Sequence, residues 1–459
     1  MGSIVPVARR ALPHPYRVSA DRRSADYGAG VTTSTPADSP APLPGAITNL
    51  RQAPAAIMVG VLCGLTLIGL SAVAEWLQGV IWEDLSSALG ADPDAGWWIV
   101  AVLTATGLGV GLVVRFAPGH AGPDSATTEL VSRPIPAIAL PGLALALVLV
   151  LAGGVSLGPE NPIMLLNASL IVLLGIRLLP HTSVPAWVEL SVAGTLGAMF
   201  GTPLAAALLL TETQPGDPRI PLWDRMVGPL LAAGSGTAVM LSLSDLSLSL
   251  DVPGYAGFQV GDLATASVIA LAACALGILA AYAISPLHAA FHRISNPVLM
   301  LTAGGLVLGL LGAVGGRETL FKGLDEMKDI SSNIGDYSPA DLALFVAVKL
   351  LALLIAAAAS FRGGRIFPAM FIGVMAGWLV HGLIDAIPAA VAVTAATLGI
   401  LIAATRNGWL AIFMALVVVP DAELLPILVL AALPAWLLVL GRPELRVEAP
   451  APAPDSQVA

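Results

Sequence analysis

Long runs of apolar residues alternate with short polar segments along most of the chain. Runs of about 20 residues are long enough to cross the hydrocarbon core of a bilayer as a helix, and shorter runs predict half-spans or re-entrant pieces. The apolar runs cover residues 55–81, 96–114, 135–151, 163–179, 186–210, 220–243, 263–285, 297–314, 340–360, 366–383, 389–403, 409–419 and 424–440. This pattern predicts an all-α, polytopic membrane protein.

Polar segments divide the chain into two comparable halves. The first membrane half covers residues 51–243, a less hydrophobic connecting segment covers 244–262, and the second half covers 263–445. Residues 1–50 hold five arginines among Pro, Ser and Ala, which predicts a disordered tail that stays cytoplasmic under the positive-inside rule. Residues 446–459 form a short C-terminal tail. A multi-pass protein of the cell membrane is expected.

Composition removes several other classes of function. Only 11% of the 459 residues are charged, against roughly 25% in a typical soluble domain. The two cysteines, Cys63 and Cys274, lie inside apolar runs, so neither a disulfide framework nor a metal cluster is indicated. The net charge of −9 is spread over loops and tails, and no nucleic-acid partner or cofactor is expected.

Three breaks rich in Gly and Pro interrupt the apolar runs, at residues 119–123, 158–162 and 363–368. A helix start exposes unpaired N–H groups and a partial positive charge, so several starts aimed at one point form an anion site. Pro162 and Pro368 are expected at the first helical position. Paired broken segments in two halves also indicate an inverted repeat with a site near the midplane.

The break at 158–162 carries an acid, Glu160. One interpretation is an ordinary solvated turn, and the other is functional, because an ionisable group inside a membrane is costly. As a tethered anion beside a helix start, the Glu160 carboxylate can occupy the site in competition with a mobile anion. Protonation would then release it.

Four short motifs resemble the CLC chloride channels and chloride/proton antiporters, in the order and approximate spacing of that family. They are Gly119-His120-Ala121-Gly122-Pro123, Gly158-Pro159-Glu160-Asn161-Pro162, Phe200-Gly201-Thr202-Pro203-Leu204-Ala205-Ala206-Ala207 and Gly363-Gly364-Arg365-Ile366-Phe367-Pro368. The resemblance implies a CLC-type inverted repeat of tilted and broken helices, a homodimer with one anion pathway per subunit, and Glu160 as the gate. The anion ligands that it implies are Gly119, His120, Gly158, Asn161, Arg365, Ile366 and Phe367.

Departures from the family pattern concern the side chains around the implied site. The departing residues are Pro159 in place of Lys or Arg, Asn161 in place of Gly, His120 in place of Ser, Ile366 in place of Phe, and Leu445 in place of the family's tyrosine. The resemblance therefore predicts an anion site that keeps its backbone ligands and loses both side-chain hydroxyls. Fluoride or another anion is an alternative to chloride for this reason.

The family's inner proton-transfer glutamate aligns with Thr213, one residue after Glu212. This alignment favours a channel-like function with chloride as the substrate. A slip of one residue would place Glu212 on a proton path, so a proton-coupled antiporter is the alternative. In that case protons join the small anion and the lipid bilayer as partners.

A membrane-embedded enzyme is the competing class. Gly154-Val155-Ser156-Leu157-Gly158 matches the Gly-x-Ser-x-Gly pattern, but it joins two membrane runs instead of a strand and a helix, and no His partner is evident. The chain has no His-Glu-x-x-His motif and no pair of aspartates inside an apolar run. No enzymatic activity is expected.

Overall fold

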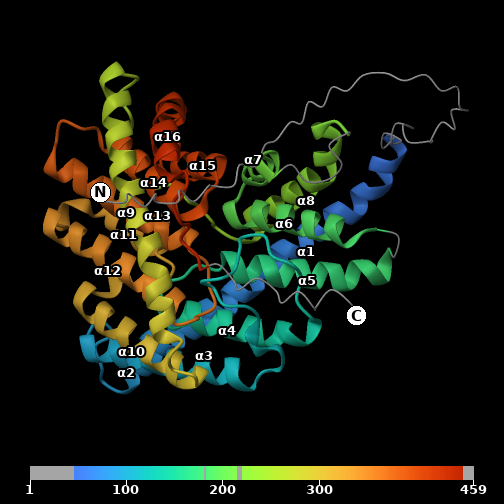
Figure 1. The fold of residues 1–459 in the computed structure, drawn as a ribbon, viewed down its shortest axis with the longest axis horizontal. Helices are drawn as coiled ribbons and strands as arrows, with labels where there is room; N and C mark the ends of the chain where they lie inside the picture. Colours follow the sequence, from blue (N-terminus) through green and yellow to red (C-terminus); the bar gives the residue numbers. More distant parts are fainter. Residues whose placement is uncertain (1–45, 180–181, 214–219, 448–459) are drawn as a thin grey trace, which may run out of the picture. The chain divides into compact units, whose positions relative to one another are not determined.

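The structure is a computed structural model that describes residues 46–179, 182–213 and 220–447 (Figure 1). Most of the predicted N-terminal tail, residues 1–45, and residues 448–459 of the predicted C-terminal tail lie outside this part of the chain. The side chains of residues 46–52 and 213 are likewise outside it. The described residues form sixteen α-helices joined by loops and six short π or 3-10 turns, without a β-strand.

The α-helices of the first half follow the predicted apolar runs with two differences: the run at 186–210 is divided into two helices at Gly201, and the short helix α2 lies outside the runs. They are α1 (Ala46–Gly79), α2 (Leu85–Ala88), α3 (Gly96–Phe116), α4 (Leu140–Ala152), α5 (Glu160–Leu178), α6 (Val184–Phe200), α7 (Pro203–Thr213) and α8 (Leu222–Leu243). Those of the second half are α9 (Val260–Phe291), α10 (Pro297–Gly315), α11 (Leu324–Ser332), α12 (Pro339–Ala358), α13 (Ile366–Leu383), α14 (Ala389–Thr405), α15 (Gly408–Val418) and α16 (Leu425–Val439).

Nine helical segments in the described ranges are long and apolar enough to cross a membrane. They include α1 continued through the π turn into α2, and α16 with the 3-10 turn before it. The helices α4, α6, α7, α14 and α15 are apolar but shorter. The prediction of an all-α polytopic fold with full spans and shorter pieces is confirmed.

The two halves are in direct contact through α3 and α10, which lie side by side in Figure 1. A Cβ atom at Gly107 of α3 would lie 2.3 Å from the carbonyl oxygen of Leu301 on α10. In the other direction, a Cβ atom at Gly305 would lie 2.3 Å from the carbonyl oxygen of Leu103. Small residues of this kind let membrane helices approach backbone to backbone, where apolar lipid gives little drive for association.

Two of the three predicted helix starts are present, with a shift of two residues. The helix α5 begins at Glu160 and α13 begins at Ile366, so Pro162 and Pro368 are third and not first in their helices. The prediction of a helix start after residues 119–123 is wrong. A 3-10 turn ends there and α4 begins only at Leu140, because three prolines interrupt the intervening segment, at Pro123, Pro134 and Pro136.

The polar segment before α12 is anchored by a buried lysine that the sequence analysis does not single out. Lys349 of α12 donates to the carbonyl oxygens of Thr319 (3.0 Å), Leu320 (2.6 Å) and Phe321 (2.9 Å). Its ammonium also lies 4.8 Å from the ring centroid of Phe371 on α13. Three carbonyl oxygens and an aromatic face replace the water that the ammonium loses on burial.

Candidate functional site

The loops before α5 and α13 pair with each other. The N–H of Gly158 donates to the carbonyl oxygen of Gly364 (2.9 Å), and the N–H of Gly364 donates to the carbonyl oxygen of Gly158 (2.6 Å). This antiparallel bridge joins equivalent breaks of the two halves. It therefore brings the first turns of α5 and α13 together.

Glu160, the first residue of α5, is fully buried at this junction. Its Oε1 atom accepts a hydrogen bond of 2.7 Å from the backbone N–H of Phe367, in the first turn of α13. The carboxylate therefore sits at the N-terminal end of the helix of the opposite half. A helix N-terminus stabilises a negative charge through its unpaired N–H groups and its dipole, so a carboxylate there occupies an anion position.

Two glycines leave the space that the Glu160 side chain fills. A Cβ atom at Gly158 would lie 2.4 Å from Glu160 Oε2, and one at Gly364 would lie 1.7 Å from the same atom. Both distances are far below van der Waals contact. The observed position of the Glu160 carboxylate therefore requires glycine at positions 158 and 364.

Three open cavities lie next to the junction, and they fall into two groups by the residues that line them. Two cavities of about 380 Å³ and about 360 Å³ reach Pro159, and both are also lined by Glu75 and Lys322. A third cavity of about 310 Å³ reaches Asn161 and Arg365. We call these the Pro159 cavities and the Asn161 cavity. Glu160 lies in the chain between Pro159, which lines the first two cavities, and Asn161, which lines the third.

A small cavity of about 20 Å³ adjoins the junction. This volume suits one water-sized occupant. Its lining includes Ser125, Asn161, Gly363, Arg365 and Leu445. The Oγ atom of Ser125 is buried and has no hydrogen-bond partner among the described residues. An unpaired hydroxyl beside the first turn of α5 can donate to a small anion.

The unpaired Ser125 hydroxyl bears on the prediction that the site loses both side-chain hydroxyls, which stays a prediction. The sequence places His120 at the family's serine position, but His120 is exposed and its Nδ1 atom is paired with the carbonyl oxygen of Val114 at 3.0 Å. Neither Gly119 nor His120 is among the residues that line the small cavity. The positive backbone φ angles of Gly119, His120 and Ala121 turn this segment before it reaches the junction.

Arg362 holds the turn at residues 119–122 against the loop before α13. Its Nε atom donates to the carbonyl oxygen of Ala121 (3.0 Å), and its Nη2 atom donates to that of His120 (3.1 Å). Its Nη1 atom donates to the carbonyl oxygen of Ser360 (2.6 Å). Arg365, three residues on, donates to the carbonyl oxygen of Leu445 and faces the small cavity and the Asn161 cavity.

Glu212, the candidate for a proton path, lies at the end of α7 and is exposed. Its carboxylate accepts from the backbone N–H groups of Gly408 (3.2 Å) and Trp409 (3.3 Å). These groups begin α15, so Glu212 caps that helix. The side chain of Thr213 lies outside the described residues.

The comparisons with known proteins agree with this architecture. A family model described as "Voltage gated chloride channel" matches residues 100–439. The protein "Putative ion-transport protein YfeO" of Escherichia coli O7:K1 (strain IAI39 / ExPEC) is 47% identical over 90% of this chain and 98% of its own length. Its counterpart from Escherichia fergusonii is 46% identical over the same shares.

Solved structures show the same fold at low sequence identity. A slow cyanobacterial Cl⁻/H⁺ antiporter aligns with a TM-score of 0.75 at 16% identity, over 86% of this chain and 96% of its own. A CLC-type fluoride/proton antiporter aligns with a TM-score of 0.66 at 18% identity, over the same shares. With a family model matched over most of the chain and relatives nearly half identical along almost their full length, this chain belongs to the CLC family.

Proposed function

We propose that this protein transports a small anion, with chloride as the expected ion, through a pathway that Glu160 gates. The observation that carries the proposal is the buried Glu160 carboxylate on the N–H of Phe367. It occupies an anion position between the Pro159 cavities and the Asn161 cavity. When the carboxylate leaves, a mobile anion can take the same N–H group.

The charges around the Asn161 cavity favour this function. Arg365, Arg406 and Arg446 line it together with two acids, Glu129 and Glu444, so cationic groups outnumber anionic ones. Arg446 is paired with both acids, so the excess positive charge comes from Arg365 and Arg406, and such an excess raises the local concentration of anions. Anions entering from this side would meet the small cavity at Ser125 next.

We propose channel-like transport in preference to proton-coupled exchange. The support is the alignment of the family's inner proton-transfer glutamate with Thr213, a residue that cannot carry a proton as a carboxylate does. Glu212, the residue before it, accepts from the backbone N–H groups of Gly408 and Trp409. Proton-coupled antiport is the second candidate, because two of the proteins with the same fold are described as Cl⁻/H⁺ and fluoride/proton antiporters. The proposal includes a homodimer in the cell membrane with the N-terminus in the cytoplasm.

Anion flux from proteoliposomes with an imposed proton gradient tests the gate. The Glu160→Gln variant has no charge to hold at the Phe367 N–H, so we expect its chloride flux to exceed that of the wild type at neutral pH and to lose its pH dependence. The matched control is Glu75→Gln, which alters an exposed acid of the Pro159 cavities that does not reach Phe367. Its flux should keep the wild-type pH dependence.

The same assay separates the alternatives. If chloride, fluoride and nitrate all fail to move through both the wild type and Glu160→Gln, the anion pathway is wrong. If an anion gradient drives protons uphill in the wild type, the antiporter replaces the channel. Equal pH dependence in the wild type and Glu160→Gln would remove Glu160 from the gate.

A further inference from the structure

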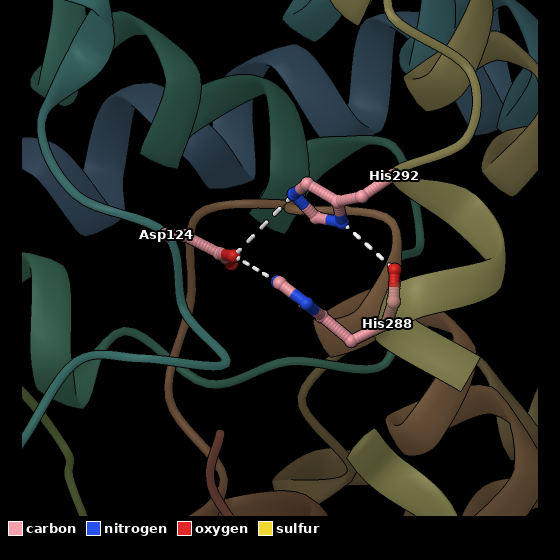
Figure 2. Close-up of side chains that lie close together, drawn as sticks. All are labelled: Asp124, His288 and His292. Atoms are coloured by element: carbon pink, nitrogen blue, oxygen red, sulfur yellow. Dashed lines mark hydrogen bonds and ion pairs between the residues drawn. The ribbon is translucent and has the colours of Figure 1, made fainter. Parts of the chain in front are cut away.

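Two histidines and an aspartate from distant parts of the chain lie close together (Figure 2). His288 and His292 are one helical turn apart, at the C-terminal end of α9, and their rings stack with centroids 3.7 Å apart. Asp124 lies in the loop after the turn at residues 118–121. Its Oδ2 atom is 2.6 Å from His288 Nε2 and 3.9 Å from His292 Nε2.

We propose that Asp124, His288 and His292 form a binding site for a divalent transition-metal ion of the zinc class. One ligand atom from each residue lies within 4.8 Å of the other two. Around a tetrahedral ion with bonds of about 2.0–2.2 Å, ligand atoms are roughly 3.3 Å apart. Side-chain rotations that move the ligand atoms by roughly 1 Å would bring the three residues to this spacing. Two imidazoles and a carboxylate with one position left to water are a ligand set that zinc accepts.

The hydrogen bond made by His292 Nδ1 leaves the other ring nitrogen, Nε2, able to bind a metal ion. His292 Nδ1 is 2.9 Å from the carbonyl oxygen of His288, and a carbonyl oxygen only accepts, so Nδ1 carries the proton. In the neutral ring the lone pair is then on Nε2, which lies 3.3 Å from Ser360 Oγ and 3.9 Å from Asp124 Oδ2, so an ion bound there displaces the Ser360 hydroxyl. A backbone carbonyl bonded to the other ring nitrogen is the usual support of a metal-bound histidine.

The helix end favours a cation against the positive charge of Arg362, which also acts on the Asp124 carboxylate, and the exposed histidine gives an ion access. The cluster lies at the C-terminal end of a helix, where unpaired carbonyl groups carry partial negative charge. The side chain of His292 is 40% exposed, whereas those of His288 and Asp124 are 15% and 18% exposed. The ion would take the place of the proton between His288 Nε2 and Asp124 Oδ2, so binding should weaken as pH falls.

An ion here would also fasten two elements to each other. Asp124 is directly before Ser125, whose hydroxyl lines the small cavity, and the histidines belong to α9. The only covalent link between these elements is the long stretch of chain from residue 124 to residue 288. Binding should therefore stabilise the folded protein in proportion to the logarithm of the free metal concentration.

Zinc binding to the full-length protein in detergent, purified without a polyhistidine tag and freed of metal, tests the site. We expect about one zinc ion per chain in competition with a fluorescent zinc chelator, and a zinc-dependent rise in the unfolding temperature. His292→Ala and Asp124→Asn each remove a direct ligand, so each should weaken binding by more than the roughly 10- to 100-fold that loss of an outer-shell partner costs. His292 is the first choice because it is the most exposed of the three side chains.

The matched control is His381→Ala. His381 also lies in the last turn of a helix, α13, and its Nδ1 atom also contacts a backbone carbonyl, that of Ile387 at 2.8 Å. It belongs to no cluster of possible metal ligands among the described residues, so its removal should leave zinc binding unchanged. Glu160→Gln should also bind zinc normally, which separates this site from the anion gate.

Two results would overturn the proposal. In the first, the wild type takes up no zinc, and Asp124 and His288 form only a hydrogen bond. In the second, zinc binds with the same affinity in the wild type, His292→Ala and Asp124→Asn, which places the ion elsewhere on the chain.

Discussion

The absence of a side chain at Gly364 leaves room for the Glu160 carboxylate, and an alanine there would fill that room. In Gly364→Ala the new Cβ atom would lie 1.7 Å from Oε2, and the carboxylate end of a flexible side chain is the part that can move. We expect the carboxylate to leave the Phe367 N–H. A hydrogen bond to a charged group contributes about 1.5–3 kcal/mol, so gate-limited anion flux should rise by about tenfold or more.

Chloride flux from proteoliposomes at neutral pH measures this effect. Gly335→Ala is the matched control, because a Cβ atom there would meet open space, and its flux should equal that of the wild type. A Gly364→Ala protein that is folded and transports at the wild-type rate, with wild-type pH dependence, would mean that the carboxylate does not limit flux. Retained intrinsic tryptophan fluorescence and a cooperative unfolding transition establish folding.

Some residues of the junction can be predicted from the sequence alone, and others cannot. Glu160, Gly158 and Gly364 can be singled out because an acid and glycines in an apolar context have few structural explanations. Ser125 cannot, since a serine near a proline is an ordinary loop residue until the fold buries its hydroxyl. The two histidines of the proposed metal site are 164 or more positions away from Asp124, and only the fold unites the three residues.

At the scale of elements, Glu326 of the helix α11 should make the stability of the folded protein depend on pH. Burial raises the pKa of Glu326 from 4.5 to about 7, against the opposing effect of the Lys349 charge. Between these values the folded protein holds a proton that the unfolded chain has lost. The contribution of Glu326 to stability should therefore fall as pH rises from about 4.5 to about 7.

A Gln at position 326 does not titrate, so the folded and unfolded chains no longer differ in the number of protons bound there. We expect Glu326→Gln to flatten the decline, by on the order of 1–2 kcal/mol because the side chain is only partly shielded from solvent. The measurement is the unfolding temperature in detergent across this pH range. Asp329→Asn, a change at an exposed acid of the same helix, should keep the wild-type slope. Identical slopes in all three proteins would rule out Glu326 as the cause.

Local sequence signals locate the long helices well but do not decide whether a helix begins directly after a break. Apolar length predicts the spans, and the breaks at 158–162 and 363–368 do lead into α5 and α13. The break at 119–123 has the same local composition but no helix directly after it. Its conformation depends on Arg362, which contacts the carbonyl oxygens of His120 and Ala121 from more than two hundred residues away. Periodicity contains no information about such a contact.

At the scale of the whole molecule, the two halves are joined both at the gate and away from it. The Gly158–Gly364 bridge and the Glu160–Phe367 hydrogen bond each take one partner from either half. The close α3–α10 contact does the same through Gly107 and Gly305. The contact of Glu160 with Phe367 therefore depends on how the halves pack, and either half expressed alone would lack one of its two partners.

Because Glu160, Phe367 and Ser125 all belong to one chain, each subunit of the predicted homodimer should hold a complete pathway. Mild crosslinking in membranes should first yield a dimer band. A linked dimer of one wild-type and one Glu160→Gln subunit should then show a flux midway between those of the two matched homodimers, since the pathways act in parallel. A flux equal to that of either homodimer would mean that one gate controls both pathways, and a strictly monomeric protein would contradict the dimer while leaving the gate at Glu160 untouched.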